Sequence, residues 1–200
     1  MSSAAAASRD SRPAGASFDG APAVTTLLLG MGNPILGDDA VGIRVAQHLS
    51  RRLGPVPGLT IREECCAGGL ELLEVVEGFD RLIVLDSIKT REGRPGDWYR
   101  FDGDALRETM HLNNVHDANF ATAMELGRQL GGHVPRDEDI HVLAVEISDN
   151  LTFSDHLSPE LQDAMPELVD EMRGEILALL DTTFREGSRS QASVVDESTT

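Results

Sequence analysis

Three side chains able to hold a divalent metal stand in separate segments of the chain. Asp39 follows a glycine-rich stretch, Asp86 directly follows four apolar residues, and His116 precedes an acid and an amphipathic segment. Two carboxylates and an imidazole suit a divalent first-row metal with open coordination positions. Taken singly, Asp39 is typical of a solvated first-turn acid and His116 of a surface or capping histidine. Asp86, at the carboxyl end of a buried strand, fits a common active-site placement, with a turn cap as the alternative. The metal hypothesis therefore depends on a fold that brings them together.

The glycines before Asp39 have a structural interpretation of their own. Gly30, Gly32 and Gly42 are typical of a tight turn that lets a strand and a helix approach closely. Dinucleotide binding is disfavoured because Asp38 and Asp39 would repel phosphate at the helix N-terminus, and because the spacing lacks a clean GxGxxG. We assign Asp38 as the N-cap of the following helix.

Other nucleophiles and ligands lack partners in the sequence. Cys65 and Cys66 are adjacent, and no histidine can be paired with either, so a cysteine protease is disfavoured and the thiols are interpreted as small core fillers. No GxSxG elbow supports a serine hydrolase. Five further histidines are expected on helix surfaces or in loops without an acidic partner; they are His48, His111, His133, His141 and His156.

Apolar runs and helical periods alternate along the chain and predict the fold class. Strands are expected at residues 24–29, 59–63, 82–85, 98–101 and 140–145, and helices from about residue 41 and at 70–76, 117–130 and 159–180. This alternation predicts an α/β fold with three layers: a mostly parallel, twisted sheet of about five strands with helices on both faces. We expect the first strand at its centre. Ligand sites in such sheets lie at the carboxyl ends of the strands, where Asp39, Asp86 and His116 would meet.

Length and composition predict one domain with two arms. The 200 residues, 40% of them hydrophobic, support a single domain at residues 23–184. Residues 1–22 and 185–200 have compositions typical of disordered arms. Without an apolar run of roughly 18 residues or a leader sequence, we expect a cytoplasmic protein with no membrane partner. A net charge of -17 disfavours nucleic acid as a partner.

A longer motif contains the glycines and both of the first two acids. From Gly30 to Gly42 the chain reads GMGNPILGDDAVG, which resembles the opening signature of the hydrogenase maturation proteases, GxGNxxxxDDxxG, at every marked position. Further similar stretches follow in chain order at residues 67–73, 82–87, 115–117 and 151–159. The resemblance covers roughly residues 24–180.

The resemblance implies an endopeptidase that removes a C-terminal peptide from the precursor of a nickel-iron hydrogenase large subunit after nickel insertion. The precursor is then the partner and supplies the nickel, so no permanently bound cofactor is expected, and we expect a monomer. Carried over by position, the nickel-contacting residues of the family fall on Asp39, Asp86 and His116. The other marked positions of the motif have a loop or structural role; they are Gly30, Gly32, Asn33, Asp38 and Gly42.

Two positions depart from the family pattern. Cys65-Cys66 stands where members often carry Gly-Gly, in a loop with Ala67 and Gly68 that is implied to take part in substrate recognition. Asp39 stands where members often carry Glu, which shortens the reach by one methylene. The attacking group is left open between a metal-polarised water, which we favour, and water activated by a carboxylate base.

Two other functions fit the same residues. A non-catalytic, nickel-dependent chaperone or binding module would engage the precursor through the same three side chains without cutting it. A related peptidase with another substrate, as in the spore-protein-degrading relatives of this fold, is disfavoured by the nearly complete match around Asp39.

Overall fold

A computed structural model describes residues 24–66, 71–103 and 115–192, with the backbone alone described at 115–121 and 182–192. The strands are β1 (Thr26–Met31), β2 (Leu59–Cys65), β3 (Arg81–Ile88), β4 (Trp98–Asp102) and β5 (Ile140–Glu146). The helices are α1 (Val41–Leu53), α2 (Glu71–Val76), α4 (Val115–Gln129) and α5 (Pro159–Ala192), with short 3-10 turns at Gly37–Ala40 and Asp137–Asp139.

The strands form one five-stranded sheet in the order β2-β1-β3-β5-β4. Neighbouring strands run parallel except for the edge pair of β4 and β5, which is antiparallel. The predicted α/β class, strand number and mostly parallel sheet are confirmed. The central strand is β3, however, and the prediction that the first strand is central was wrong. Both strands are apolar and buried on both faces, so burial alone did not distinguish their order.

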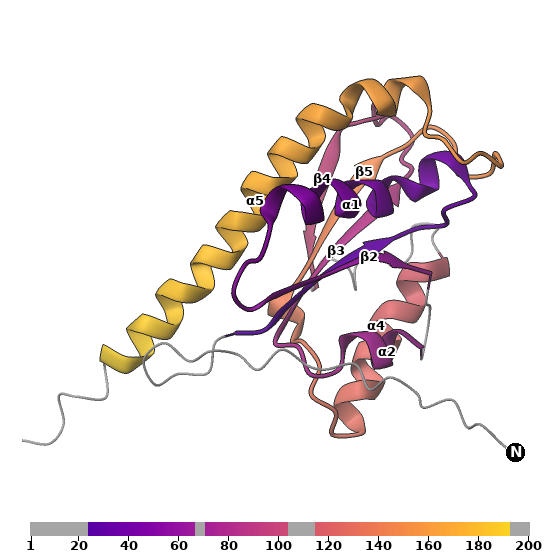
Figure 1. The fold of residues 1–200 in the computed structure, drawn as a ribbon. Helices are drawn as coiled ribbons and strands as arrows, with labels where there is room; N and C mark the ends of the chain where they lie inside the picture. Colours follow the sequence, from indigo (N-terminus) through magenta and orange to yellow (C-terminus); the bar gives the residue numbers. More distant parts are fainter. Residues whose placement is uncertain (1–23, 67–70, 104–114, 193–200) are drawn as a thin grey trace, which may run out of the picture.

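Helices cover both faces of this sheet and make three layers. Figure 1 shows α1 and α5 on one side and α2 and α4 on the other. Because side chains alternate along a strand, Leu28 and Leu85 belong to the cluster under α1 and α5, whereas Leu27 and Val84 belong to the cluster under α2 and α4. Full burial of such side chains stabilises the fold by roughly 1.5–3 kcal/mol each.

Two glycines allow the first strand, turn and helix to pack at short range. A Cβ at Gly42 would lie 2.3 Å from the Leu85 carbonyl oxygen and 2.6 Å from that of Met31. Gly32 has a φ of +133°, and a Cβ there would lie 2.1 Å from the Asp39 carbonyl oxygen. The interpretation of these glycines as a close strand-to-helix connection is confirmed.

The last helix runs further than the sequence pattern predicted. α5 ends at Ala192, beyond residue 184, where the predicted domain ends. The division into one domain and two arms stays a prediction. No helix among the described residues has the length and apolar character needed to cross a membrane.

Candidate functional site

Asp39 lies in the 3-10 turn between β1 and α1, with both carboxylate oxygens hydrogen-bonded. The backbone N–H of Asn33 donates to Oδ2 at 2.8 Å, and the Ser87 hydroxyl donates to Oδ1 at 2.9 Å. The first bond comes from the glycine loop and the second from the end of β3. Two separate segments therefore set the direction of this half-buried carboxylate, and each oxygen keeps a second lone pair for a ligand.

Asp86 lies beside it, inside the last part of β3. The strand does not end at this acid, as the apolar run had indicated, but continues to Ile88 through pairing with β5. The backbone N–H of Ser87 donates to Asp86 Oδ1 at 2.8 Å. Ser87 thus contacts both acids, Asp39 through its hydroxyl and Asp86 through its N–H. The fold therefore brings Asp39 into contact with the residue that follows Asp86, at the carboxyl edge of the sheet.

His116 is the second residue of α4, and its side chain lies outside the described part of the structure. The segment that follows α4 lies against the turn before β3, where the Gly78 N–H donates to the His133 carbonyl oxygen at 2.7 Å. The C-terminal end of α4 therefore lies towards the amino edge of the sheet, and its N-terminal end lies towards the carboxyl edge. That is the edge of Asp86, and α4 covers the face on which Asp86 lies.

A complete metal site is not present among the side chains that the structure describes. Within them, no three His, Cys, Asp or Glu residues come together as ligands. Since His116 is not one of them, the assignment of Asp39, Asp86 and His116 as a set stays a prediction.

Asp38 does not cap α1, so that assignment was wrong. The 3-10 turn Gly37–Ala40 precedes the helix, Ala40 takes the N-cap position, and no side chain caps it. Asp38 is instead buried, and its Oδ1 accepts the backbone N–H of Ser158 at 2.6 Å. This acid ties the loop before α1 to the start of α5.

The two cysteines differ in burial, so their interpretation as core fillers is confirmed for Cys65 and wrong for Cys66. Cys65 is buried at the end of β2, while Cys66 is exposed and its thiol contacts the Gly32 carbonyl oxygen at 3.7 Å. Partial burial, followed by the negative charge of Glu64, raises the pKa of the Cys66 thiol. Because the thiolate is the nucleophile, this agrees with the rejection of a cysteine protease. Ala67 and Gly68, with which they were grouped, lie outside the described residues.

The expectation that five histidines lack acidic partners was wrong for three of them. Each has a ring nitrogen within 3.4 Å of a carboxylate oxygen; the pairs are His133 with Asp80, His141 with Asp102 and His156 with Asp155. The first two join residues far apart in sequence, which no local pattern reveals. The pairs of His133 with Asp80 and of His141 with Asp102 lie towards the amino ends of the parallel strands, away from the candidate site. Of the other two, His48 lies in α1, and His111 lies outside the described residues.

Sequence reasoning missed two residues at the carboxyl edge. Ser87 follows Asp86 directly and links it to Asp39. Glu146 stands at the end of the apolar run of β5, just as Asp86 stands at the end of the apolar run of β3. The Glu146 residue is only 1% exposed. The same signal, an acid at the end of a buried strand, therefore identified one and would have identified the other.

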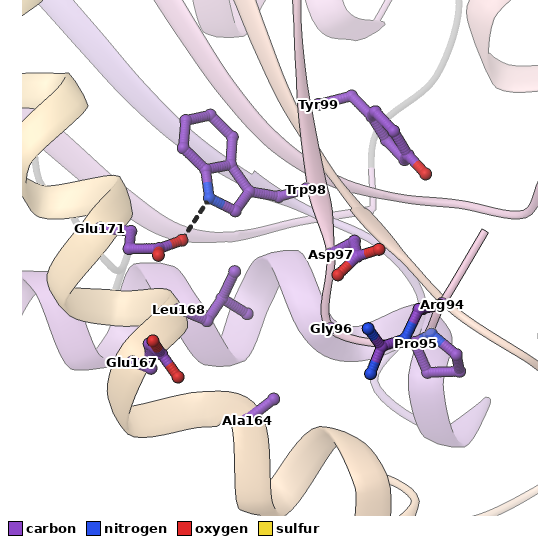
Figure 2. Close-up of a pocket in the computed structure, with 10 residues that line it drawn as sticks. All are labelled: Arg94, Pro95, Gly96, Asp97, Trp98, Tyr99, Ala164, Glu167, Leu168 and Glu171. Atoms are coloured by element: carbon purple, nitrogen blue, oxygen red, sulfur yellow. Dashed lines mark hydrogen bonds between the residues drawn. The ribbon is translucent and has the colours of Figure 1, made fainter.

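A pocket of about 590 Å³ opens at the same end of the sheet, between the start of β4 and α5. Figure 2 shows residues 94–99 on one side and residues of α5 on the other, with the Trp98 indole N–H donating to Glu171 at 2.8 Å. Neither Asp39 nor Asp86 lines it. The pocket is therefore a separate feature from the candidate site.

Comparison with protein families identifies the chain. The family model HycI, described as hydrogenase maturation protease, matches residues 43–175. The chain belongs to the hydrogenase maturation protease family, as its motifs predicted. Among curated relatives, the hydrogenase 2 maturation protease of Escherichia coli is 34% identical over 70 residues, which make up 35% of this chain and 42% of that protein. The alignment thus spans less than half of that relative's length.

Solved structures share the fold. The hydrogenase-maturating endopeptidase HybD from E. coli superposes with a TM-score of 0.61 at 22% identity, over 74% of this chain and 90% of that one. The [NiFe] hydrogenase maturation protease HybD from Thermococcus kodakarensis gives a TM-score of 0.59 at 18% identity, over 76% of this chain and 98% of that one. At these identities the similarity supports the architecture alone.

Proposed function

We propose that this chain is an endopeptidase that removes the C-terminal extension from the precursor of a nickel-iron hydrogenase large subunit once nickel has been inserted. Family membership supports the reaction class and the kind of substrate. The observation that carries the proposal to particular residues is the bond from the Ser87 hydroxyl to Asp39, which places this acid next to the strand end that carries Asp86. Open α/β sheets bind their ligands at this edge.

In this proposal the nickel belongs to the substrate and serves as its recognition mark. Asp39, Asp86 and His116 contact the metal of the loaded precursor, and this docking holds the scissile peptide bond beside them. A borderline divalent ion accepts two carboxylates and an imidazole as ligands. The fixed direction of the Asp39 carboxylate favours such docking because little side-chain freedom is lost on binding.

The chemical step is hydrolysis by water near the docked metal. The positive charge of the substrate's nickel polarises this water and stabilises the negative charge that develops on the peptide oxygen. The exposed Cys66, whose thiol contacts the Gly32 carbonyl oxygen in the glycine turn, lies against the precursor. The protein needs no resident cofactor and acts as a monomer in the cytoplasm.

The test uses nickel-loaded and nickel-free precursor, with loss of the C-terminal peptide followed by mass spectrometry. Asp86→Ala and His116→Ala are compared with Asp163→Ala and His156→Ala, which remove an acid and a histidine from exposed positions. We expect cleavage of the loaded precursor only, lost in the first pair and kept in the second. Nickel-dependent binding without any cleavage would replace the endopeptidase by the chaperone alternative. Full activity in the first pair would remove these residues from the site.

A further inference from the structure

The connection between β3 and β4 carries an unusual concentration of positive charge. Lys89, Arg91 and Arg94 account for three of the chain's 17 Lys and Arg residues within six positions that hold one acid, Glu92, in a protein of net charge -17. All three are exposed. We call residues 89–94 the basic connection.

A buried carboxylate holds the backbone of the basic connection in place. Glu146 accepts the backbone N–H of Thr90 at 2.6 Å and the Thr90 hydroxyl at 3.0 Å, and that hydroxyl also accepts the N–H of Gly93 at 3.0 Å. A Cβ at Gly93 would lie 2.1 Å from the carboxyl carbon of Glu146, so the loop backbone packs directly on the acid. Burying a carboxylate is costly unless its oxygens are hydrogen-bonded, and here those bonds go to the loop.

Backbone bonds fasten both ends of the connection to the end of β5. Ile147 N–H donates to the Ile88 carbonyl at 2.8 Å, and Gly96 N–H donates to the Glu146 carbonyl at 3.0 Å. Glu146 N–H in turn donates to the Asp97 carbonyl at 2.8 Å. These bonds tie both ends of the loop to the end of β5.

The cations on this loop are largely left without acidic partners. Elsewhere among the described residues, some arginines contact a carboxylate within 4.0 Å and others do not: Arg52, Arg81, Arg100, Arg128 and Arg136 do, whereas Arg44, Arg51, Arg62 and Arg173 do not. Among the described residues Arg91 and Arg94 make no such ion pair, and Figure 2 shows Arg94 across the pocket from Glu167 and Glu171 with no bond to either. Lys89 likewise makes no ion pair within 4.0 Å among the described residues, although its charge adds to the bonds from Thr152 and Leu151 that lower the pKa of Asp149.

The loop also stands next to the candidate site. It begins three residues after Asp86, and in the sheet Asp86 pairs with Ala144 while Ile88 pairs with Glu146. Asp86 and Glu146 thus lie on the same face of neighbouring strands, two positions apart along them. A substrate segment that reaches Asp86 passes close to the basic connection.

We propose that the basic connection binds carboxylate groups of the precursor segment that carries the scissile bond. The proposal rests on the proposed function and adds to it the charge of the substrate. Guanidinium groups pair with carboxylates through two parallel hydrogen bonds, which favours this class of ligand. Because the chain as a whole is strongly acidic, a local positive surface beside the site is needed to attract an acidic segment there.

The test is a triple substitution with a matched control. The variant Lys89→Gln, Arg91→Gln, Arg94→Gln is compared with Arg51→Gln, Arg62→Gln, Arg173→Gln, which removes three exposed charges elsewhere. With nickel-loaded precursor at low salt, we expect KM to rise about tenfold and kcat to stay within about twofold in the first variant only. The difference should fade at about 0.5 M salt, where exposed charges are screened.

Two altered precursors distinguish the sources of the carboxylate. One has every Asp and Glu of the extension replaced by Asn and Gln, and the other has a short Gly-Ser tail beyond its natural end, which moves the terminal carboxylate away. If side-chain carboxylates bind, the first precursor raises KM for the unsubstituted protein but not for the triple variant. If the terminal carboxylate binds, the second precursor raises KM for the unsubstituted protein but not for the triple variant.

The inference and the proposed function fail in different ways. Equal KM and equal salt dependence in the two triple variants, with cleavage intact, would overturn the basic connection while leaving the endopeptidase in place. Unchanged KM with both altered precursors would overturn the assignment to carboxylates. Absence of cleavage by the unsubstituted protein itself would overturn the proposed function and the inference with it.

Discussion

Ser87→Ala removes the hydroxyl that donates to Asp39 and leaves the backbone bond from Ser87 to Asp86 in place. The Ser87 hydroxyl is buried and donates to Asp39 Oδ1 at 2.9 Å, whereas the backbone bond from Ser87 to Asp86 does not depend on the side chain. The substitution therefore takes one of two donors from Asp39 and leaves Asp86 with its backbone partner. It loosens the first acid without removing any proposed ligand.

The size of the effect follows from the acceptor's charge and exposure. A hydrogen bond to a charged group contributes roughly 1.5–3 kcal/mol, and partial exposure of Asp39 reduces the expected loss to about 1–2 kcal/mol of unfolding free energy. Asp39 keeps the bond from Asn33, so its carboxylate stays near its position with more freedom. We expect kcat/KM for the loaded precursor to fall about tenfold because the docking geometry is less well defined.

Urea unfolding and single-turnover cleavage measure the two effects, with Ser158→Ala as the control. The Ser158 hydroxyl is buried without a partner among the described residues, so its removal should change unfolding free energy by less than about 0.5 kcal/mol. A double-mutant cycle with Asp39→Ala should give a coupling of about 1 kcal/mol between Asp39 and Ser87. A coupling near zero, or unchanged cleavage in Ser87→Ala, would refute the view that Ser87 orients Asp39.

Two further predictions concern stability. Gly42→Ala forces a methyl group against two strand carbonyls and should cost at least about 3 kcal/mol of unfolding free energy. Gly174→Ala has nothing within 4 Å of its Cβ and should stabilise α5 by roughly 0.5–1 kcal/mol. Urea titration measures both changes. Burial, opposed by the bond to Asp102, lowers the pKa of His141 below its ordinary value of 6.5. The unfolded chain then binds the proton first, so stability should fall as pH drops below 6.5, and His141→Gln should flatten this dependence; an unchanged slope would contradict the assignment.

The elements were predictable because their signals are local. The apolar runs that became β1, β3 and β5 and the helical stripe of α1 needed no knowledge of the rest of the chain. The order of the strands was not predictable in the same way. β1 and β3 are buried to a similar degree, and their positions in the sheet depend on connections that local periodicity does not encode.

The site shows the same division between local and distant information. The positions of Asp39 and Asp86 after strands predicted that they would lie at one edge, and their shared contact with Ser87 agrees with that prediction. Asp38 was misassigned because the local rule for helix caps does not include Ser158, which lies 120 residues further on. The partner of His141 was missed for the same reason, since Asp102 is 39 residues away.

The bond between Asp38 and Ser158 has a consequence for when the site forms during synthesis. The turn that carries Asp39 is fastened to the start of α5 through this bond and through Gly37, whose N–H donates to the Ser154 carbonyl at 2.9 Å. Both partners leave the ribosome long after the turn itself. The first acid of the site therefore acquires its final support only when nearly the whole chain has been made. A nascent chain, or one truncated before Ser154, would carry the complete glycine motif and still lack both of these bonds.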